Sequence, residues 1–149
     1  MTARNVFFAL LMAILAVPLA ACLPVEDVLP RQHVVEWPGQ RLLFVADERA
    51  GRVQSFHLGS GAPVACAQTR QSRHSRVRDM QLDVPHGKLW VLGYNGISVY
   101  DARSLVLQRY IPVEGASISA LRIEGDRVVL LAGSGTTVGE IDSRSSVFG

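Results

Sequence analysis

Short apolar runs follow one another from His33 to the end of the 149-residue chain. They are rich in Val, Ile, Leu and aromatic residues, and each ends at Gly, Asp, Asn, Ser or Pro, as strands bounded by turns do. No stretch of this region keeps a 3.6-residue apolar period with capping residues. The sequence therefore predicts an all-β fold with almost no helix after the N-terminal leader.

The runs group into three similar units. Trp90 follows Phe44 by 46 residues, and Leu130 follows Trp90 by 40, which are spacings typical of four-stranded propeller blades. We expect Phe44, Trp90 and Leu130 to be equivalent, and likewise His57, Asp101 and Asp142. The expected strands are 33–37, 41–47, 52–58 and 63–68 in the first unit, 77–84, 88–93, 96–102 and 105–111 in the second, and 117–124, 127–132, 136–142 and 145–148 in the third.

Four segments of the later units resemble the repeat of the YVTN or YncE-like β-propellers: Lys88–Gly93, Gly96–Asp101, Leu107–Val113 and Ala120–Asp126. The resemblance covers residues 88–142 well and residues 41–68 loosely. It implies three propeller-like four-stranded antiparallel blades. The matching segments carry no catalytic motif, and the architecture does not indicate a function because it hosts many.

The chain departs from that family in blade number, because closed propellers have four to eight blades. Three blades alone leave two flanks whose apolar faces would meet water. Four outcomes stay open at this point: self-association into a six-bladed ring, a different partner protein, a compact packing that is not a propeller, and a truncated remnant. We expect a protein partner or a second copy to cover the flanks.

The N-terminus reads as an export signal. Arg4 precedes an apolar run from Val6 to Leu19, and Leu19-Ala20-Ala21-Cys22 follows. This ending resembles the lipobox of bacterial lipoproteins, which implies cleavage before Cys22 and lipid on its thiol. An ordinary secretory signal and an uncleaved anchor helix are the alternatives. The expected organisation is a signal peptide at 1–21, a lipidated Cys and tether at 22–32, and a propeller-like repeat domain at 33–149.

Location follows from the same resemblance. In bacterial lipoproteins, an Asp directly after the lipidated Cys favours retention in the inner membrane. This chain has Leu23 at that position, so we expect a lipid-anchored protein of the cell envelope, on the periplasmic face of the outer membrane. Removal of Arg4 with the leader lowers the formal charge from +2 to +1, so composition gives no case for nucleic acid as a partner. Cys66 would then be the one remaining thiol, and its place in a strand predicts a buried small apolar side chain.

The most distinctive polar stretch runs from Arg70 to Arg78 and links the first two units. In a propeller this link shares a face with the turn that contains Tyr94, and Arg forks suit carboxylate or phosphate groups. A solvated loop is the alternative interpretation. The candidate residues for binding an anionic ligand are Arg70, Arg73, His74, Arg76, Arg78 and Tyr94.

No catalytic set stands out. The four His residues are scattered without metal-ligand spacing, no cofactor motif occurs, and the acids around Gly125 are expected to cap turn donors. The sequence therefore predicts a lipid-anchored exported binding or assembly module that acts through protein contacts at the membrane. The alternative is a sensor of an anionic ligand through the Arg70–Arg78 loop, and a propeller-type lyase or hydrolase is less favoured.

Overall fold

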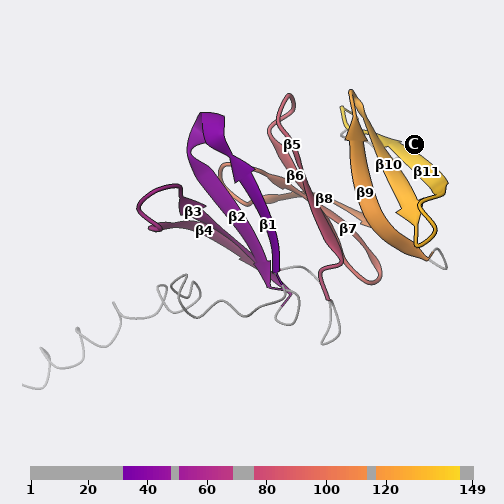
Figure 1. The fold of residues 1–149 in the computed structure, drawn as a ribbon, viewed down its shortest axis with the longest axis horizontal. Coiled ribbons are helices and arrows are strands. Elements are labelled where there is room, and N and C mark those ends of the chain that lie inside the picture. The colour runs from indigo at the N-terminus through magenta and orange to yellow at the C-terminus, as the bar shows by residue number, and fades with distance from the viewer. Residues whose placement is uncertain (1–31, 48–50, 69–75, 114–116, 145–149) are drawn as a thin grey trace, which may run out of the picture.

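Strands account for almost all of the regular structure in the computed structural model (Figure 1), which describes residues 32–47, 51–68, 76–113 and 117–144. One 3-10 turn, η3 (Pro38–Gln40), is the exception among these residues. The strands are β1 (Gln32–Trp37), β2 (Leu42–Asp47), β3 (Arg52–His57), β4 (Pro63–Gln68), β5 (Asp79–Asp83), β6 (Lys88–Leu92), β7 (Gly96–Asp101), β8 (Leu107–Pro112), β9 (Ile118–Glu124), β10 (Arg127–Ala132) and β11 (Thr137–Asp142).

These strands form three antiparallel sheets in which neighbours along the chain are neighbours in space. Blade 1 has the order β1-β2-β3-β4, blade 2 has β5-β6-β7-β8, and blade 3 has β9-β10-β11. Figure 1 shows the three sheets side by side, with β5 packed between β1 and β9. The prediction of an all-β fold of propeller-like blades is confirmed, with four strands in two blades and three in the described part of the third. The expected last strand, 145–148, lies outside the described residues.

Two apolar layers hold the blades together. The layer between blades 1 and 2 contains Phe44, Val53, Leu89 and Tyr100. The layer between blades 2 and 3 contains Trp90, Ile97, Leu121, Val128 and Leu130. Alternation along each strand sends successive side chains to opposite faces, so Leu89 and Trp90 on β6 pack against different blades. Blade 2 is therefore buried on both of its faces.

The expected equivalence of Leu130 with Phe44 and Trp90 is wrong. Phe44 and Trp90 face the following blade, whereas Leu130 faces back toward blade 2. Strand pairing gives the corrected equivalence, since Trp90 is the third residue of β6 and Val129 the third of β10. By contrast, His57, Asp101 and Asp142 each pair with the first residue of the preceding strand, Leu42, Lys88 and Arg127, so their equivalence is confirmed.

The two outer flanks differ in character. On blade 1, Val34 and Val64 lie on the face turned away from blade 2 and are 53% and 43% exposed. On blade 3, Arg122 and Glu124 on β9 form an ion pair at 2.6 Å, and Arg127 and Glu140 join β10 to β11 at 3.0 Å. The outer face of blade 3 is therefore mixed: these ion pairs lie beside Val129 and Leu131, which alternate with the inward-facing Val128 and Leu130, and beside the exposed Val138.

Cys66 also departs from expectation. It is half-buried rather than buried, because β4 is the edge strand of blade 1 and Cys66 lies on the face turned away from blade 2, opposite Gln54. Gly96, at the start of β7, shows why the chain needs a small residue there: a Cβ at this position would lie 2.5 Å from the carbonyl oxygen of Ile111.

Across the described ranges, no helix is both long enough and apolar enough to span a membrane. Cys22 and the segments 1–21 and 22–31 lie outside the described residues.

Candidate functional site

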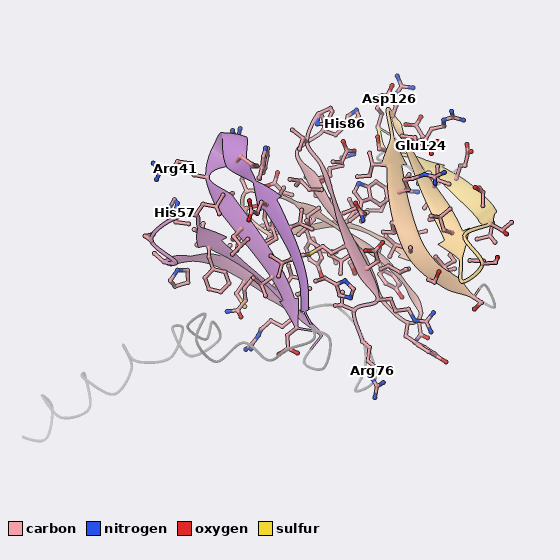
Figure 2. All side chains as sticks on the ribbon, viewed as in Figure 1. Arg41, His57, Arg76, His86, Glu124 and Asp126 are labelled. Carbon is pink, nitrogen blue, oxygen red and sulfur yellow. The ribbon has the colours of Figure 1, made fainter. Side chains whose placement is uncertain are left out.

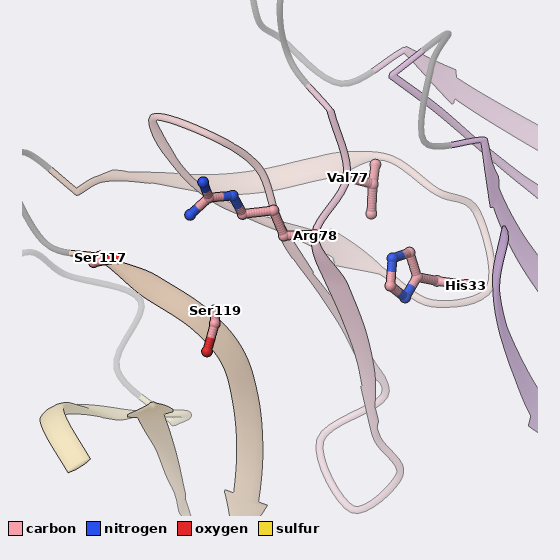
Figure 3. Close-up of a pocket in the computed structure, with 5 residues that line it drawn as sticks. All are labelled: His33, Val77, Arg78, Ser117 and Ser119. Atoms are coloured by element: carbon pink, nitrogen blue, oxygen red, sulfur yellow. The ribbon is translucent and has the colours of Figure 1, made fainter. Parts of the chain in front are cut away.

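A pocket opens where the three inner strands begin. It has a volume of about 370 Å³ and is lined by His33 of β1, Val77 and Arg78 before β5, and Ser117 and Ser119 at the start of β9. Figure 3 shows His33 reaching from β1 toward the start of β5, while the guanidinium of Arg78 extends toward Ser117. Each blade thus contributes to one polar site, since β5 packs against both β1 and β9.

Arg78 is held in the pocket by two contacts. Its Nη1 donates a hydrogen bond of 2.8 Å to the carbonyl oxygen of Ile118 in blade 3. Its guanidinium also lies over the ring of Tyr94, with 4.8 Å between Cζ and the ring centroid, within the range of a cation–π contact. The turn that contains Tyr94 and the link that contains Arg78 therefore share one face, as predicted. These two predicted residues come together.

Of the predicted anion-binding residues in the described part of the chain, Arg78 alone lines the pocket, and Tyr94 contacts Arg78 without lining it. Arg76 is exposed and extends from the lower end of the molecule in Figure 2, and it does not line the pocket. Arg70, Arg73 and His74 lie outside the described residues. The predicted site is therefore reduced, in the described part of the chain, to Arg78 and Tyr94.

Sequence reasoning missed His33, Ser117 and Ser119 as pocket residues. Their positions in the predicted strands could have identified them, because each lies within the first two residues of an inner strand or just before it. In a propeller these strands converge, so polar residues at their starts gather at one end. Composition alone gives no reason to choose them over other Ser and His residues.

A second polar cluster joins blades 2 and 3 at the opposite end of the molecule. His86 Nδ1 lies 2.9 Å from both carboxylate oxygens of Asp83, and His86 Nε2 lies 3.3 Å from Asp126 Oδ1. Figure 2 places His86 and Asp126 together at the top, away from Arg76. The expectation that Asp126 only caps a turn is wrong, because its carboxylate also pairs with Arg144 at 3.2 Å.

This cluster holds the blades rather than arranging a nucleophile. Ser143 is fully buried, and its Oγ lies 3.2 Å from His86 Nδ1, the nitrogen that Asp83 also contacts. Asp126 does contact the opposite ring nitrogen, Nε2, but the hydroxyl of a catalytic serine must reach a substrate, and the Ser143 side chain is fully buried and shares Nδ1 with Asp83. Lys88 Nζ donates to the carbonyl oxygen of Ser143, which further ties β6 to blade 3. Among the described residues, no group of three or more His, Cys, Asp or Glu side chains could hold a metal ion.

Asp101 ends β7 and caps the turn that follows. Its Oδ1 accepts hydrogen bonds from the main-chain N–H of Ser104 at 2.9 Å, from the Ser104 hydroxyl at 2.8 Å, and from the main-chain N–H of Arg103 at 3.1 Å. These bonds, led by the one from the Ser104 N–H, lower the pKa of Asp101 below its ordinary value. This is structural turn chemistry.

The sequence matches no protein-family model and no curated protein. Among solved structures, it is similar to the computationally designed Ika4 protein, with 16% identity and a TM-score of 0.58 over 73% of this chain and 63% of that one. A chain of the mitotic checkpoint complex has 17% identity and a TM-score of 0.58, over 70% of this chain and 34% of that one. BamB from Moraxella catarrhalis has 15% identity and a TM-score of 0.54, over 79% and 36%.

These neighbours include propeller-type proteins. The fold is that of propeller blades. At these identities the likeness concerns fold alone, and the chain spans between 34% and 63% of the lengths of these three neighbours.

Proposed function

We propose that the chain is a lipid-anchored, exported binding module that holds a partner protein by strand addition at the outer edge of β11. The observation that carries this proposal is the strand count of blade 3. Blades 1 and 2 have a fourth strand beside the third, and within the described residues no strand lies on that side of β11. Residues 145–148, the expected fourth strand of blade 3, lie outside the described residues, and in this proposal a partner's strand takes this place. An edge strand offers rows of main-chain N–H and C=O groups to an extended segment.

The character of blade 3 supports the edge over the flank as the place of attachment. The flank carries the Arg122–Glu124 and Arg127–Glu140 pairs, and burying such pairs against another blade carries a desolvation cost. At the edge, Val138 is 51% exposed and offers an apolar contact to an added strand. The checkpoint-complex neighbour is itself part of a protein assembly, which is consistent with the use of this fold in protein binding.

Site-specific photo-crosslinking in cells that make the protein tests the proposal. A benzophenone amino acid replaces Val138 in β11 or, as the matched control, Val106, an exposed valine in blade 2. We expect a discrete protein adduct from position 138 and none from position 106. Equal adducts from both positions, or none from position 138, would contradict the proposal.

Lipid anchoring is tested separately at Cys22. We expect the wild-type chain to incorporate a clickable palmitate analogue and to fractionate with membranes, and Cys22→Ser to do neither. Density separation of the two membranes then tests the outer-membrane location. Membrane retention of Cys22→Ser without label would instead support an uncleaved anchor helix.

A further inference from the structure

The pocket at the starts of the inner strands contains a cation that no carboxylate of the described residues neutralises. Within the described chain, Arg78 makes no ion pair; it donates to a neutral carbonyl and lies over an aromatic ring. The adjacent Asp79 is committed elsewhere: Oδ1 accepts the main-chain N–H of Met80 at 2.8 Å, and Oδ2 accepts that of Leu121 at 2.7 Å. The guanidinium thus retains N–H donors for an outside anion, since it carries five.

The other polar groups of the pocket indicate which functional groups a ligand carries besides its negative charge. Ser119 Oγ donates to the carbonyl oxygen of Leu131 at 3.2 Å, so toward a ligand its oxygen acts as an acceptor. The hydroxyl of Ser117 and the ring of His33 have no hydrogen-bond partner among the described residues, and each can donate to or accept from a ligand. A ligand that fits presents an anionic group, such as a carboxylate, to Arg78 and hydroxyl groups to Ser119 and His33.

We propose that this pocket binds a small polyhydroxylated carboxylic acid, of the class of sugar acids. The volume of about 370 Å³ lies in the lower part of the range for small-molecule sites. Four of the five lining residues are polar, with Val77 as the apolar member, which suits a ligand covered with oxygen rather than an apolar one. This proposal stands apart from strand addition at β11, which lies on the far side of blade 3 from β9.

Calorimetric titration of the full chain in detergent tests the proposal, with gluconate, glucose, acetate and inorganic phosphate as probes. We expect gluconate to bind best, because it alone combines the charge with several hydroxyls. An affinity for glucose equal to that for gluconate would show that Arg78 does not contribute to binding. An equal affinity for acetate or phosphate would show that the hydroxyl-binding groups do not contribute. Either result, or no binding of gluconate, overturns the proposal.

Variants locate the site. Arg78→Gln should weaken gluconate binding about 10- to 100-fold, the effect of losing a charge-assisted hydrogen bond. Arg78→Gln also removes the hydrogen bond to Ile118, so a second variant is needed. Ser117→Asp keeps Arg78 and places in the pocket a negative charge that repels the gluconate carboxylate. It should abolish gluconate binding. Arg76→Gln removes a nearby exposed arginine outside the pocket and should leave the affinity unchanged. If Ser117→Asp binds gluconate like the wild type while folded, this pocket is not the site.

Discussion

The Asp79 carboxylate, at the first residue of β5, accepts a 2.7 Å hydrogen bond through Oδ2 from the main-chain N–H of Leu121 in β9. Its other oxygen accepts the N–H of Met80 at 2.8 Å. One side chain therefore joins the inner strands of blades 2 and 3, next to the pocket that Arg78 lines. Inner strands of different blades have no main-chain ladder between them, so a side-chain bridge of this kind sets their spacing.

Replacing Asp79 should weaken the junction of blades 2 and 3. In Asp79→Ala the partly buried N–H of Leu121 loses its acceptor, and the cost of an unsatisfied donor is about 1–3 kcal/mol. Urea unfolding followed by circular dichroism measures the loss. Glu36→Ala, an exposed carboxylate on β1, is the control and should change the free energy of unfolding by less than about 0.5 kcal/mol. Equal effects of the two substitutions would contradict the bridging role of Asp79.

His86 should stabilise the other end of the same junction. Asp83 is fully buried, and His86 is the side chain that pairs with it, at 2.9 Å. His86→Ala leaves a buried carboxylate without that partner, which costs about 3 kcal/mol in comparable pairs. Thermal unfolding compares it with His57→Ala, which removes an exposed ring and should shift the melting temperature little. A wild-type melting temperature for His86→Ala would show that Asp83 does not need the imidazole.

Much of the fold could be predicted because turn-forming residues mark the ends of most strands in the sequence. The expected strand 63–68 coincides with β4, and 52–58 and 96–102 each exceed β3 and β7 by one residue. The error at Leu130 has a physical origin: Val128, Val129, Leu130 and Leu131 form an uninterrupted apolar run, and a run without alternation does not say which face each residue takes.

The polar sites were harder to predict, since each depends on how blades pack. Arg78 and Tyr94 were identified because both lie in connections that a propeller places on one face. The pairing of His86 with Asp126 spans 40 residues between two hairpins, and neither turn alone indicates it. The ion pair of Arg127 with Glu140 on the outer face of blade 3 was also missed, because these two residues meet only once β10 and β11 are in register.

Gly96 should be intolerant of any side chain. A Cβ there would lie 2.5 Å from the Ile111 carbonyl oxygen and 2.5 Å from the Tyr110 hydroxyl, so β8 would have to move. Gly96→Ala should destabilise the protein by about 1–3 kcal/mol, the range for overpacking, as measured by denaturant unfolding. Gly133→Ala is a matched control, because a Cβ at position 133 meets nothing within 4 Å. Indistinguishable unfolding curves for the two variants would argue against the close approach of β8.

Acid should remove the contribution of Asp101. Hydrogen bonds from Ser104 and Arg103 lower the pKa of Asp101 in the folded state. The ionised carboxylate therefore adds to the free energy of unfolding above its unfolded pKa of 3.8, and this addition is lost as pH falls through the lower folded pKa. Asp101→Asn should therefore lower the melting temperature near neutral pH. Below pH 3.8, the gap between wild type and variant should narrow. A gap that stays constant from neutral pH into this acidic range would refute the linkage.

In the proposed arrangement, three blades form an open unit whose third blade offers an edge to a partner, not a flank to a second copy. Multi-angle light scattering of the full lipidated chain in detergent, at a series of protein concentrations, tests this most directly. Because a two-chain ring would bury the Arg122–Glu124 and Arg127–Glu140 pairs against the apolar flank of blade 1, we expect the protein mass of a single chain at every concentration. A stable mass of two chains, maintained on dilution, would contradict the account and support a closed six-bladed ring.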